Sequence, residues 1–274
     1  MIAILILALL FGLIIGSFLN VCIYRWPRDL SVVQPRSHCI ACEKTISWYD
    51  NIPVVSFAML HGRCRYCGAR IPWRYPLVEL LTGFVFVWFA WTLDLTLVAL
   101  KLAVLATILI ALIFTDLEER ILPDELTLGG AAAGLVFAGF VPMPESFVRV
   151  FLFLAGYHPP PRVVWIMEAA LGALIPAFVL WLAGWIYERV RHREGLGLGD
   201  VKLVALMGAY LGLSGALLTL AAGSVMGVII GYGYIRATGK DPSTFELPFG
   251  SFLGVAGIAI AMGARQILGW YGGQ

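Results

Sequence analysis

The sequence predicts an all-α, polytopic membrane protein with about eight transmembrane helices and one long polar loop after the first helix. Of its 274 residues, 60% are hydrophobic and only 13% are charged, whereas soluble proteins carry about 25% charged residues. The apolar residues lie in long uncharged blocks, which is the pattern of membrane spans. The polar loop stands out because it contains four of the five cysteines.

The predicted spans follow one another with short connections. The first block shows neither the basic start nor the cleavage pattern of a signal peptide, so we expect a retained span. The spans are predicted at 1–24, 76–93, 96–115, 126–141, 163–187, twice within 203–235, and at 247–268. The lipid bilayer is therefore the expected environment of most of the chain.

The uncharged run at 203–235 is the least regular of these blocks. A single helix over this run would be about 50 Å long, which is too long for a hydrocarbon core of ~30 Å. Gly212-Leu213-Ser214-Gly215 lies near the middle of the run and can form a turn. We therefore predict two short spans here.

Positive charge predicts the orientation of the spans, because Lys and Arg gather on the cytoplasmic side. With eight spans, 15 Lys or Arg residues fall on one side, at 25–75, 116–125, 188–202 and 236–246, and four fall on the other. The polar loop is therefore expected in the cytoplasm. The net charge of +2, without a basic run, excludes a nucleic-acid partner.

The polar loop contains two Cys-x-x-Cys pairs, Cys39 with Cys42 and Cys64 with Cys67. Two such turns can supply the four thiolates of a tetrahedral zinc site. A cytoplasmic setting disfavours stable disulfides, and four protein ligands leave no position for a catalytic water. We therefore predict structural Zn²⁺, with unligated or redox-active pairs as the alternative, and interpret Cys22 as a packing residue of the first span.

Two aspartates at span ends form a candidate catalytic pair. Asp200 follows Gly197-Leu-Gly199 where a span begins, and Asp116 lies where the third span ends. Two spans separate them, so both are expected on the same membrane face. Two neighbouring carboxyl groups can share a proton and activate water.

Other acids compete with this pair, and the spacing alone does not exclude them. Asp124 can be a helix N-cap after Pro123, or a supporting residue together with Gly197, Gly199 and Lys202. Glu118, Glu119 and Glu125 fit solvated or substrate-contacting charges. No Ser-His-Asp, Cys-His or metal-protease arrangement is evident among the four histidines.

Along nearly its whole length the chain resembles the bacterial type IV prepilin leader peptidases. The resemblance rests on four blocks of sequence. They are Gly-Ser-Phe-Leu-Asn-Val at 16–21 with Arg25-Trp26-Pro27; the cysteine loop with Asp50-Asn51-Ile52-Pro53 and Tyr75-Pro76-Leu77-Val78-Glu79; Asp116 with Leu122-Pro123-Asp124; and Gly197-x-Gly199-Asp200-x-Lys202. One departure is Ser251, which stands where the family commonly has proline.

The resemblance implies an aspartyl protease of the Gly-x-Gly-Asp type with Asp116 and Asp200 as catalytic residues. It implies cleavage of the basic leader from type IV prepilins and type II secretion pseudopilins at the cytoplasmic face of the bacterial inner membrane. It also implies methylation of the new N-terminus with S-adenosylmethionine, an activity associated with the cysteine loop. No residues for this methyl donor can be assigned from the sequence.

The expected organisation is a first transmembrane helix at 1–24, a cytoplasmic four-cysteine zinc loop at 25–75, and a transmembrane protease domain at 76–274. Two other functions stay open from the residues alone. One is a Gly-x-Gly-Asp intramembrane protease with other substrates. The second is a non-enzymatic membrane assembly protein whose zinc loop docks a partner.

Overall fold

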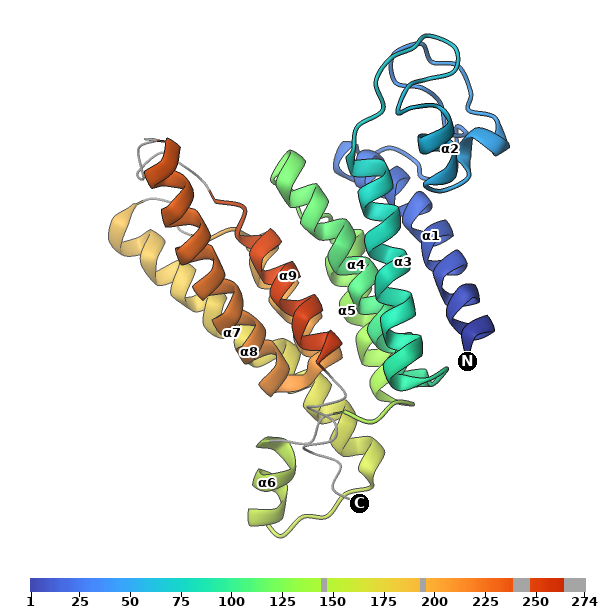
Figure 1. The fold of residues 1–274 in the computed structure, drawn as a ribbon. Coiled ribbons are helices and arrows are strands. Elements are labelled where there is room, and N and C mark those ends of the chain that lie inside the picture. The colour runs from blue at the N-terminus through green and yellow to red at the C-terminus, as the bar shows by residue number, and fades with distance from the viewer. Residues whose placement is uncertain (144–146, 193–195, 239–246, 264–274) are drawn as a thin grey trace. The chain divides into compact units, whose positions relative to one another are not determined.

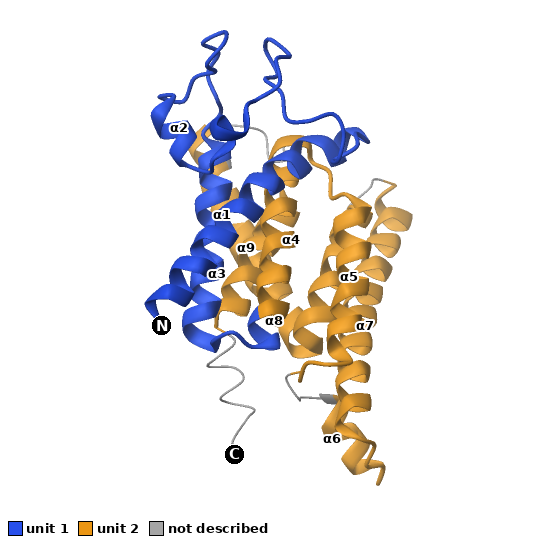
Figure 2. Ribbon diagram, turned by 90° about the vertical axis from the view of Figure 1, so that its right-hand side faces the viewer, with its two compact units in different colours: residues 1–99 blue, residues 100–274 orange. Residues whose placement is uncertain are grey.

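The computed structural model describes residues 1–143, 147–192, 196–238 and 247–263, which form helices joined by turns and by one long loop at 26–73 (Figure 1). Within these ranges there is no strand apart from two isolated bridges, so the predicted all-α class is confirmed. Residues 239–246 of the predicted segment 236–246, and the end of the last predicted span, 264–268, lie outside the described residues. The chain divides into two compact units, 1–99 and 100–274 (Figure 2).

Unit 1 is built on two antiparallel helices, α1 (Ile2–Arg25) and α3 (Arg74–Leu93). Two glycines of α1 set their separation. A Cβ on Gly12 would lie 2.8 Å from the Cα of Gly83, and one on Gly16 would lie 2.7 Å from the Cα of Glu79. Side chains at these two positions would push the helices apart, which is why small residues are common where membrane helices cross closely.

The loop between α1 and α3 has little regular structure: η1 (Trp26–Arg28), η2 (Trp48–Asn51) and α2 (Val55–Met59). Its first part is held by Arg25, whose guanidinium donates to the carbonyls of Ser31 at 2.8 Å and Pro35 at 2.7 Å. This arginine is almost fully buried at the end of α1. Its charge is therefore used to satisfy backbone groups of the loop.

The described residues of unit 2 form six helices. They are α4 (Leu97–Glu119), α5 (Asp124–Ala138), α6 (Phe147–Leu154), α7 (Pro161–Arg191), α8 (Leu198–Thr238) and α9 (Phe249–Met262). The helix α8 contacts α5, α7 and α9. Helix α6 lies in the proline-containing connection for which no helix was predicted, because eight residues are too few to give a clear periodic pattern.

The first segment of α8 runs parallel to α9. At its start, a Cβ on Gly199 would lie 3.1 Å from Leu122, and a Cβ on Gly250, at the start of α9, would lie 3.0 Å from the same Leu122 atom. Further along, Met207 approaches Gly257. Residue numbers therefore increase together along the two helices.

The second segment of α8 runs antiparallel to α9, beside which it lies in Figure 1. Its Gly223 approaches Leu253, and its Gly231 approaches Leu247, which precedes the first residue of α9. The chain therefore reverses direction inside α8. The reversal occurs at Gly212, whose φ of 72° and ψ of −176° are not helical.

The reversal is stabilised by a buried carboxylate from α7. Glu168 is 1% exposed, and one of its oxygens accepts a hydrogen bond from the backbone N–H of Leu213 at 3.3 Å. This N–H begins the second segment and has no helical partner of its own. The positive φ of Gly212 suits glycine, because a Cβ disfavours that conformation. The predicted division of this run into two helical segments is confirmed.

All eight predicted apolar blocks are helical in the described residues. By length and composition, five of the described helices can cross a membrane: α1 with η1, α3, α4, α7 and α8, the last taken across its break at Gly212. The helices α5, with 15 residues, and α9, with 14, are shorter. The chain is thus a polytopic membrane protein, in agreement with the predicted fold class.

Substitution of Gly208 tests the close packing of α7 on α8. A Cβ at this position would overlap the backbone carbonyl of Gly172, so Gly208→Ala is expected to destabilise the fold by ~1–3 kcal/mol. The thermal unfolding temperature in detergent should fall by several degrees. The matched control is Gly129→Ala on α5, where a Cβ meets nothing within 4 Å. Equal unfolding temperatures for the two variants would contradict the packing described.

Candidate active site and metal centre

Asp116 lies near the C-terminal end of α4, which stops at Glu119 because Arg120 turns the chain with a φ of 57°. Its side chain is buried, with 7% of the residue exposed. One carboxylate oxygen accepts two hydrogen bonds from Ser251 on α9, from the backbone N–H at 2.7 Å and from the hydroxyl at 2.7 Å. The carboxylate therefore lies at the N-terminus of α9, where unpaired N–H groups and the helix dipole favour negative charge.

Asp200 is in the first turn of α8 and is partly exposed. Its backbone N–H donates to the carbonyl of Gly197 at 3.1 Å, which forms the turn that begins the helix. The starts of α8 and α9 meet at Leu122, as the contacts of Gly199 and Gly250 show. A Cβ on Gly250 would also lie 3.3 Å from the carboxyl carbon of Asp116.

The structure therefore brings the two predicted aspartates to one place from helix ends far apart in the chain. Gly250 lies against the Asp116 carboxyl group, Gly199 directly precedes Asp200, and both glycines pack on Leu122. Two carboxyl groups that share a site can hold one proton between them. In such a pair, the carboxylate can accept a proton from water and the carboxylic acid can donate one. The pair can therefore catalyse hydrolysis without a covalent intermediate.

The predicted supporting residues occupy the same region. Lys202 on α8 forms an ion pair with Asp124 on α5, with 2.6 Å between the ammonium nitrogen and a carboxylate oxygen. Both side chains are partly exposed, so the pair contributes less than about 1 kcal/mol. The interpretation of Asp124 as a helix N-cap is wrong by one residue. Pro123 occupies the N-cap, and Asp124 is the first helical residue, because the fixed proline φ suits a helix start.

The competing acids Glu118 and Glu119 follow Asp116 at the end of α4, where Glu118 is exposed and Glu119 partly exposed. Ser251 donates both of its hydrogen bonds to Asp116, which distinguishes this acid from its neighbours on α4.

Ser251 is the site residue that sequence reasoning missed. It was noted only as a departure from the family's usual proline. The one signal in the sequence is that Ser251 carries a hydroxyl group at the start of an apolar span. No sequence pattern shows that this hydroxyl meets Asp116, because 135 positions separate the two residues.

The four paired cysteines form a second site, in unit 1. Both Cys-x-x-Cys turns have the same backbone hydrogen bonds. Glu43 N–H donates to Cys39 at 2.8 Å and Gly68 N–H donates to Cys64 at 3.0 Å. The residue after each second cysteine has a positive φ, 57° at Glu43 and 71° at Gly68. An isolated bridge closes each turn, between His38 and Thr45 and between Arg63 and Arg70.

The ligand atoms of Cys39, Cys42, Cys64 and Cys67 all lie within 4.8 Å of one another. The sulfurs of Cys39 and Cys67 are 3.8 Å apart, which is about the separation that a tetrahedral site with Zn–S bonds near 2.3 Å requires. Hydrogen bonds from the backbone N–H groups of Cys67 and Tyr66 lower the pKa of the Cys64 thiol to about 7. At Cys67 a backbone hydrogen bond from Ala69 opposes a rise, but burial and the neighbouring cysteines raise the pKa of the thiol to about 11. The positions of the four sulfur atoms, rather than the charge of the thiols, therefore indicate that the cluster can hold a zinc ion.

Cys22 takes no part in this cluster. It is fully buried in α1, as expected for a small packing residue.

The fold and the two sites define the class: a polytopic helical membrane protein with a pair of aspartates at helix ends and a four-cysteine centre in a separate unit. Residues 10–93 match the family model of the bacterial peptidase A24 N-terminal domain, and residues 103–232 match that of the type IV leader peptidase family.

Curated relatives agree with this class. The prepilin leader peptidase/N-methyltransferase of Aeromonas salmonicida is 36% identical over 97% of this chain and 92% of its own length. Proteins of the same name from Myxococcus xanthus and Neisseria gonorrhoeae are 39% and 32% identical, over 84% and 92% of this chain and 62% and 87% of their own lengths. No solved structure matches significantly. The chain belongs to the type IV leader peptidase family.

Substitution of Ser251 tests its contact with Asp116. Ser251→Ala removes one of two hydrogen bonds to a buried carboxylate, which is worth ~1.5–3 kcal/mol, so kcat for leader cleavage should fall by about 10- to 100-fold. KM should change little. Ser251→Thr keeps the hydroxyl and should recover most of the activity. An equal loss in Ser251→Ala and Ser251→Thr would show that packing, not the hydrogen bond, is responsible.

The matched control for this substitution is Ser214→Ala. Ser214 lies on the second segment of α8, just after the break at Gly212 and about 20 Å along the helix from Asp200. Its removal should leave kcat unchanged.

Removal of single cysteines tests the metal centre. Wild-type protein should carry one zinc ion per chain, measured by elemental mass spectrometry, and Cys39→Ser or Cys64→Ser should lose it, because a closed site requires all four thiolates. Cys22→Ala is the control and should keep the metal. Chelation should expose the 25–75 loop to proteases, since the loop has no core of its own. Purified protein without metal, with all four cysteines intact, would contradict the assignment.

Proposed function

We propose that this protein removes the basic leader from type IV prepilins and type II secretion pseudopilins at the cytoplasmic face of the bacterial inner membrane, and methylates the new N-terminal residue. The names of its relatives support cleavage and methylation. The observation that carries the proposal is the meeting of Asp116 and Asp200 at the ends of two helices of unit 2.

In the proposed mechanism the aspartates share one proton. The ionised member of the pair accepts a proton from water as the water attacks the scissile carbonyl, and the protonated member donates to the carbonyl oxygen. The proton then passes to the leaving amine. Because the groups are coupled, their titration belongs to the pair. Ser251 positions the Asp116 carboxylate through its two hydrogen bonds.

The substrate is expected to approach with its charged leader in water and its apolar helix in the bilayer. The excess of Lys and Arg in the polar loop and at the aspartate end supports a cytoplasmic position for both sites. Glu118 and Glu119 continue α4 beyond Asp116, where their negative charge can attract a basic leader. Helices of unit 2 would hold the apolar part of the prepilin.

Methylation requires a donor, which we propose to be S-adenosylmethionine. The donor supplies an electrophilic methyl group on sulfur. The protein must bind it, exclude competing water and orient the new N-terminal amine toward that methyl group. The four-cysteine centre lies in the unit that matches the N-terminal family model, and we assign it a structural role.

Replacement of the aspartates tests the peptidase assignment. Asp116→Asn and Asp200→Asn should each lower kcat for cleavage of a purified prepilin in detergent by at least about 100-fold, because each carboxyl group handles a proton in the reaction. Unfolding temperature and zinc content should stay unchanged. Asp94→Asn, in the exposed turn between α3 and α4, is the control and should cleave normally.

Other outcomes separate the alternatives. If Asp116→Asn cleaves while Asp124→Asn does not, the first member of the pair is misassigned. If all variants cleave normally, the protease assignment is lost and a zinc-loop assembly protein becomes the better explanation. Cleavage of apolar helices that lack a prepilin leader would instead indicate an intramembrane protease with other substrates.

A further inference from the structure

Unit 1 contains a cavity of about 450 Å³. Its lining residues come from α1, α3 and both cysteine turns, and include Ser17, Asn20, Cys39, Cys64, Tyr75 and Glu79. This volume lies within the ~300–1,000 Å³ of ordinary small-molecule sites. Three segments of the family resemblance, at 16–21, 50–53 and 75–79, contribute residues to its lining.

Asn20 contributes an acceptor without a partner. The residue is 2% exposed, and its amide nitrogen donates to the carbonyls of Tyr75 at 3.0 Å and Gly16 at 3.3 Å. Those two carbonyls fix which end of the amide is the oxygen. That oxygen, Oδ1, is buried and has no hydrogen-bond partner among the described residues. Buried acceptors are nearly always satisfied in native proteins, so a donor from a ligand or water is expected here.

Glu79 adds a negative charge to the same cavity. It is 7% exposed, and it accepts hydrogen bonds from the backbone N–H of Val54 at 2.8 Å and from the hydroxyl of Ser17. A carboxylate offers about four acceptor positions, so capacity remains for a ligand. Val54 has a φ of 62° and a ψ of −47°, a strained conformation for a β-branched residue. Strain of this kind persists where the surroundings hold it, often at binding sites.

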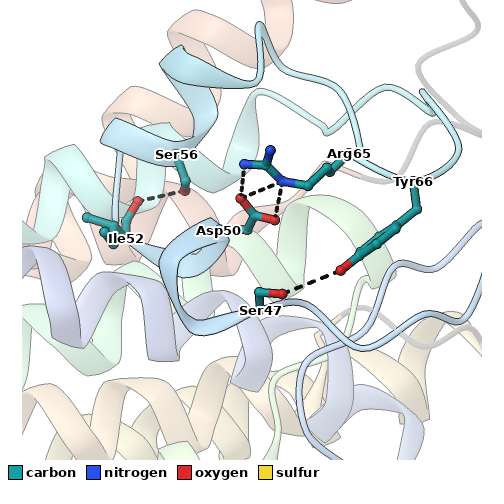
Figure 3. Close-up of polar contacts among 6 residues, drawn as sticks. All are labelled: Ser47, Asp50, Ile52, Ser56, Arg65 and Tyr66. Carbon is teal, nitrogen blue, oxygen red and sulfur yellow. Dashed lines mark hydrogen bonds and ion pairs between the residues drawn. The ribbon is translucent and has the colours of Figure 1, made fainter.

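Another part of the cavity lining, around Asp50, is bonded to residues of the second cysteine turn. Arg65 forms a bidentate pair with Asp50, with nitrogen–oxygen distances from 2.6 to 3.1 Å, and Ser47 contacts the Tyr66 hydroxyl at 3.4 Å (Figure 3). The guanidinium holds the pKa of Asp50 below its usual range. A metal in the cysteine cluster would therefore fix this part of the cavity lining.

The chemistry of the lining indicates the class of ligand. Four aromatic rings line the cavity, from Tyr24, Phe57, Tyr66 and Tyr75. Three arginines also line it: Arg25, which is bonded to loop carbonyls, Arg65, which is paired with Asp50, and Arg70. Aromatic faces accept a flat base or a cationic centre, Glu79 complements positive charge, and Asn20 accepts a hydrogen bond. A nucleoside that carries a sulfonium cation combines a base, a positive charge and donor groups.

We propose that this cavity binds the methyl donor, a sulfonium nucleoside, with Glu79 and Asn20 as its polar contacts. The inference rests on the proposed methyltransferase function and gives it a site. In the transfer, the lone pair of the new N-terminal amine forms an N–C bond to the methyl carbon. The S–C bond breaks with its electron pair going to sulfur, which leaves as a neutral thioether, and the amine releases a proton to water.

The test measures binding of S-adenosylmethionine to the full-length, zinc-loaded protein in detergent by equilibrium dialysis. Glu79→Gln removes the charge but keeps an oxygen that can accept from Val54 and Ser17, and it should raise Kd at least tenfold. Asn20→Leu should do the same. The matched control is Glu188→Gln on the exposed end of α7, which should leave Kd unchanged. Unchanged Kd in both cavity variants would overturn the proposal.

A second measurement needs no variant. Radiolabelled S-adenosylmethionine is cross-linked to wild-type protein by ultraviolet light, and the labelled peptides are identified by mass spectrometry. Label within 17–79 supports the cavity, and label confined to 100–274 overturns it. This result decides the question if a cavity variant does not fold.

Assays of the wild-type protein distinguish failure of the proposed methyltransferase function from failure of the cavity assignment alone. If it removes the leader but neither methylates the product nor binds the donor, the proposed methyltransferase function fails and the cavity assignment fails with it. If it methylates the product while Glu79→Gln and Asn20→Leu bind the donor normally, only the cavity assignment fails.

Discussion

The hydrogen bonds from Ser251 to the buried carboxylate of Asp116 fix the site of unit 2. A buried carboxylate is tolerated only where donors replace the water it has lost. The N-terminus of α9 supplies a backbone N–H, and the serine hydroxyl supplies a second donor to the same oxygen. This contact joins the end of α4 to the start of α9.

Close packing at glycines brings the second aspartate to this place. Gly199 and Gly250 both allow Leu122 to approach, so the starts of α8 and α9 meet beside the end of α4. At the far end of the first α8 segment, Gly208 and Gly172 let α7 and α8 touch backbone to backbone. Gly212 then reverses the chain, with Glu168 satisfying the first N–H of the returning helix. Glycine thus acts here through the absence of a side chain.

The polar loop of unit 1 is held in place by other interactions. This loop is too polar and too short to bury a core, so its order depends on backbone turns, on buried Arg25 and on the four-cysteine cluster. The same elements surround a cavity whose buried groups, Asn20 and Glu79, are anchored on α1 and α3. A centre that orders a loop can in this way also shape a ligand site, without any chemistry at the metal.

The sequence by itself determined the helical membrane class and the four cysteines that cluster, because hydropathy and Cys-x-x-Cys spacing are local properties of a chain. It also singled out Asp116 and Asp200, whose catalytic role remains a prediction. It also indicated the reversal near Gly212, since helix length is limited by bilayer thickness. Only the tertiary structure decided that Ser251 holds Asp116, that Asp124 pairs with Lys202 and that Asn20 and Glu79 share a cavity. These contacts join residues that are far apart in the chain. A local sequence pattern cannot indicate them, because they form only when the helices pack.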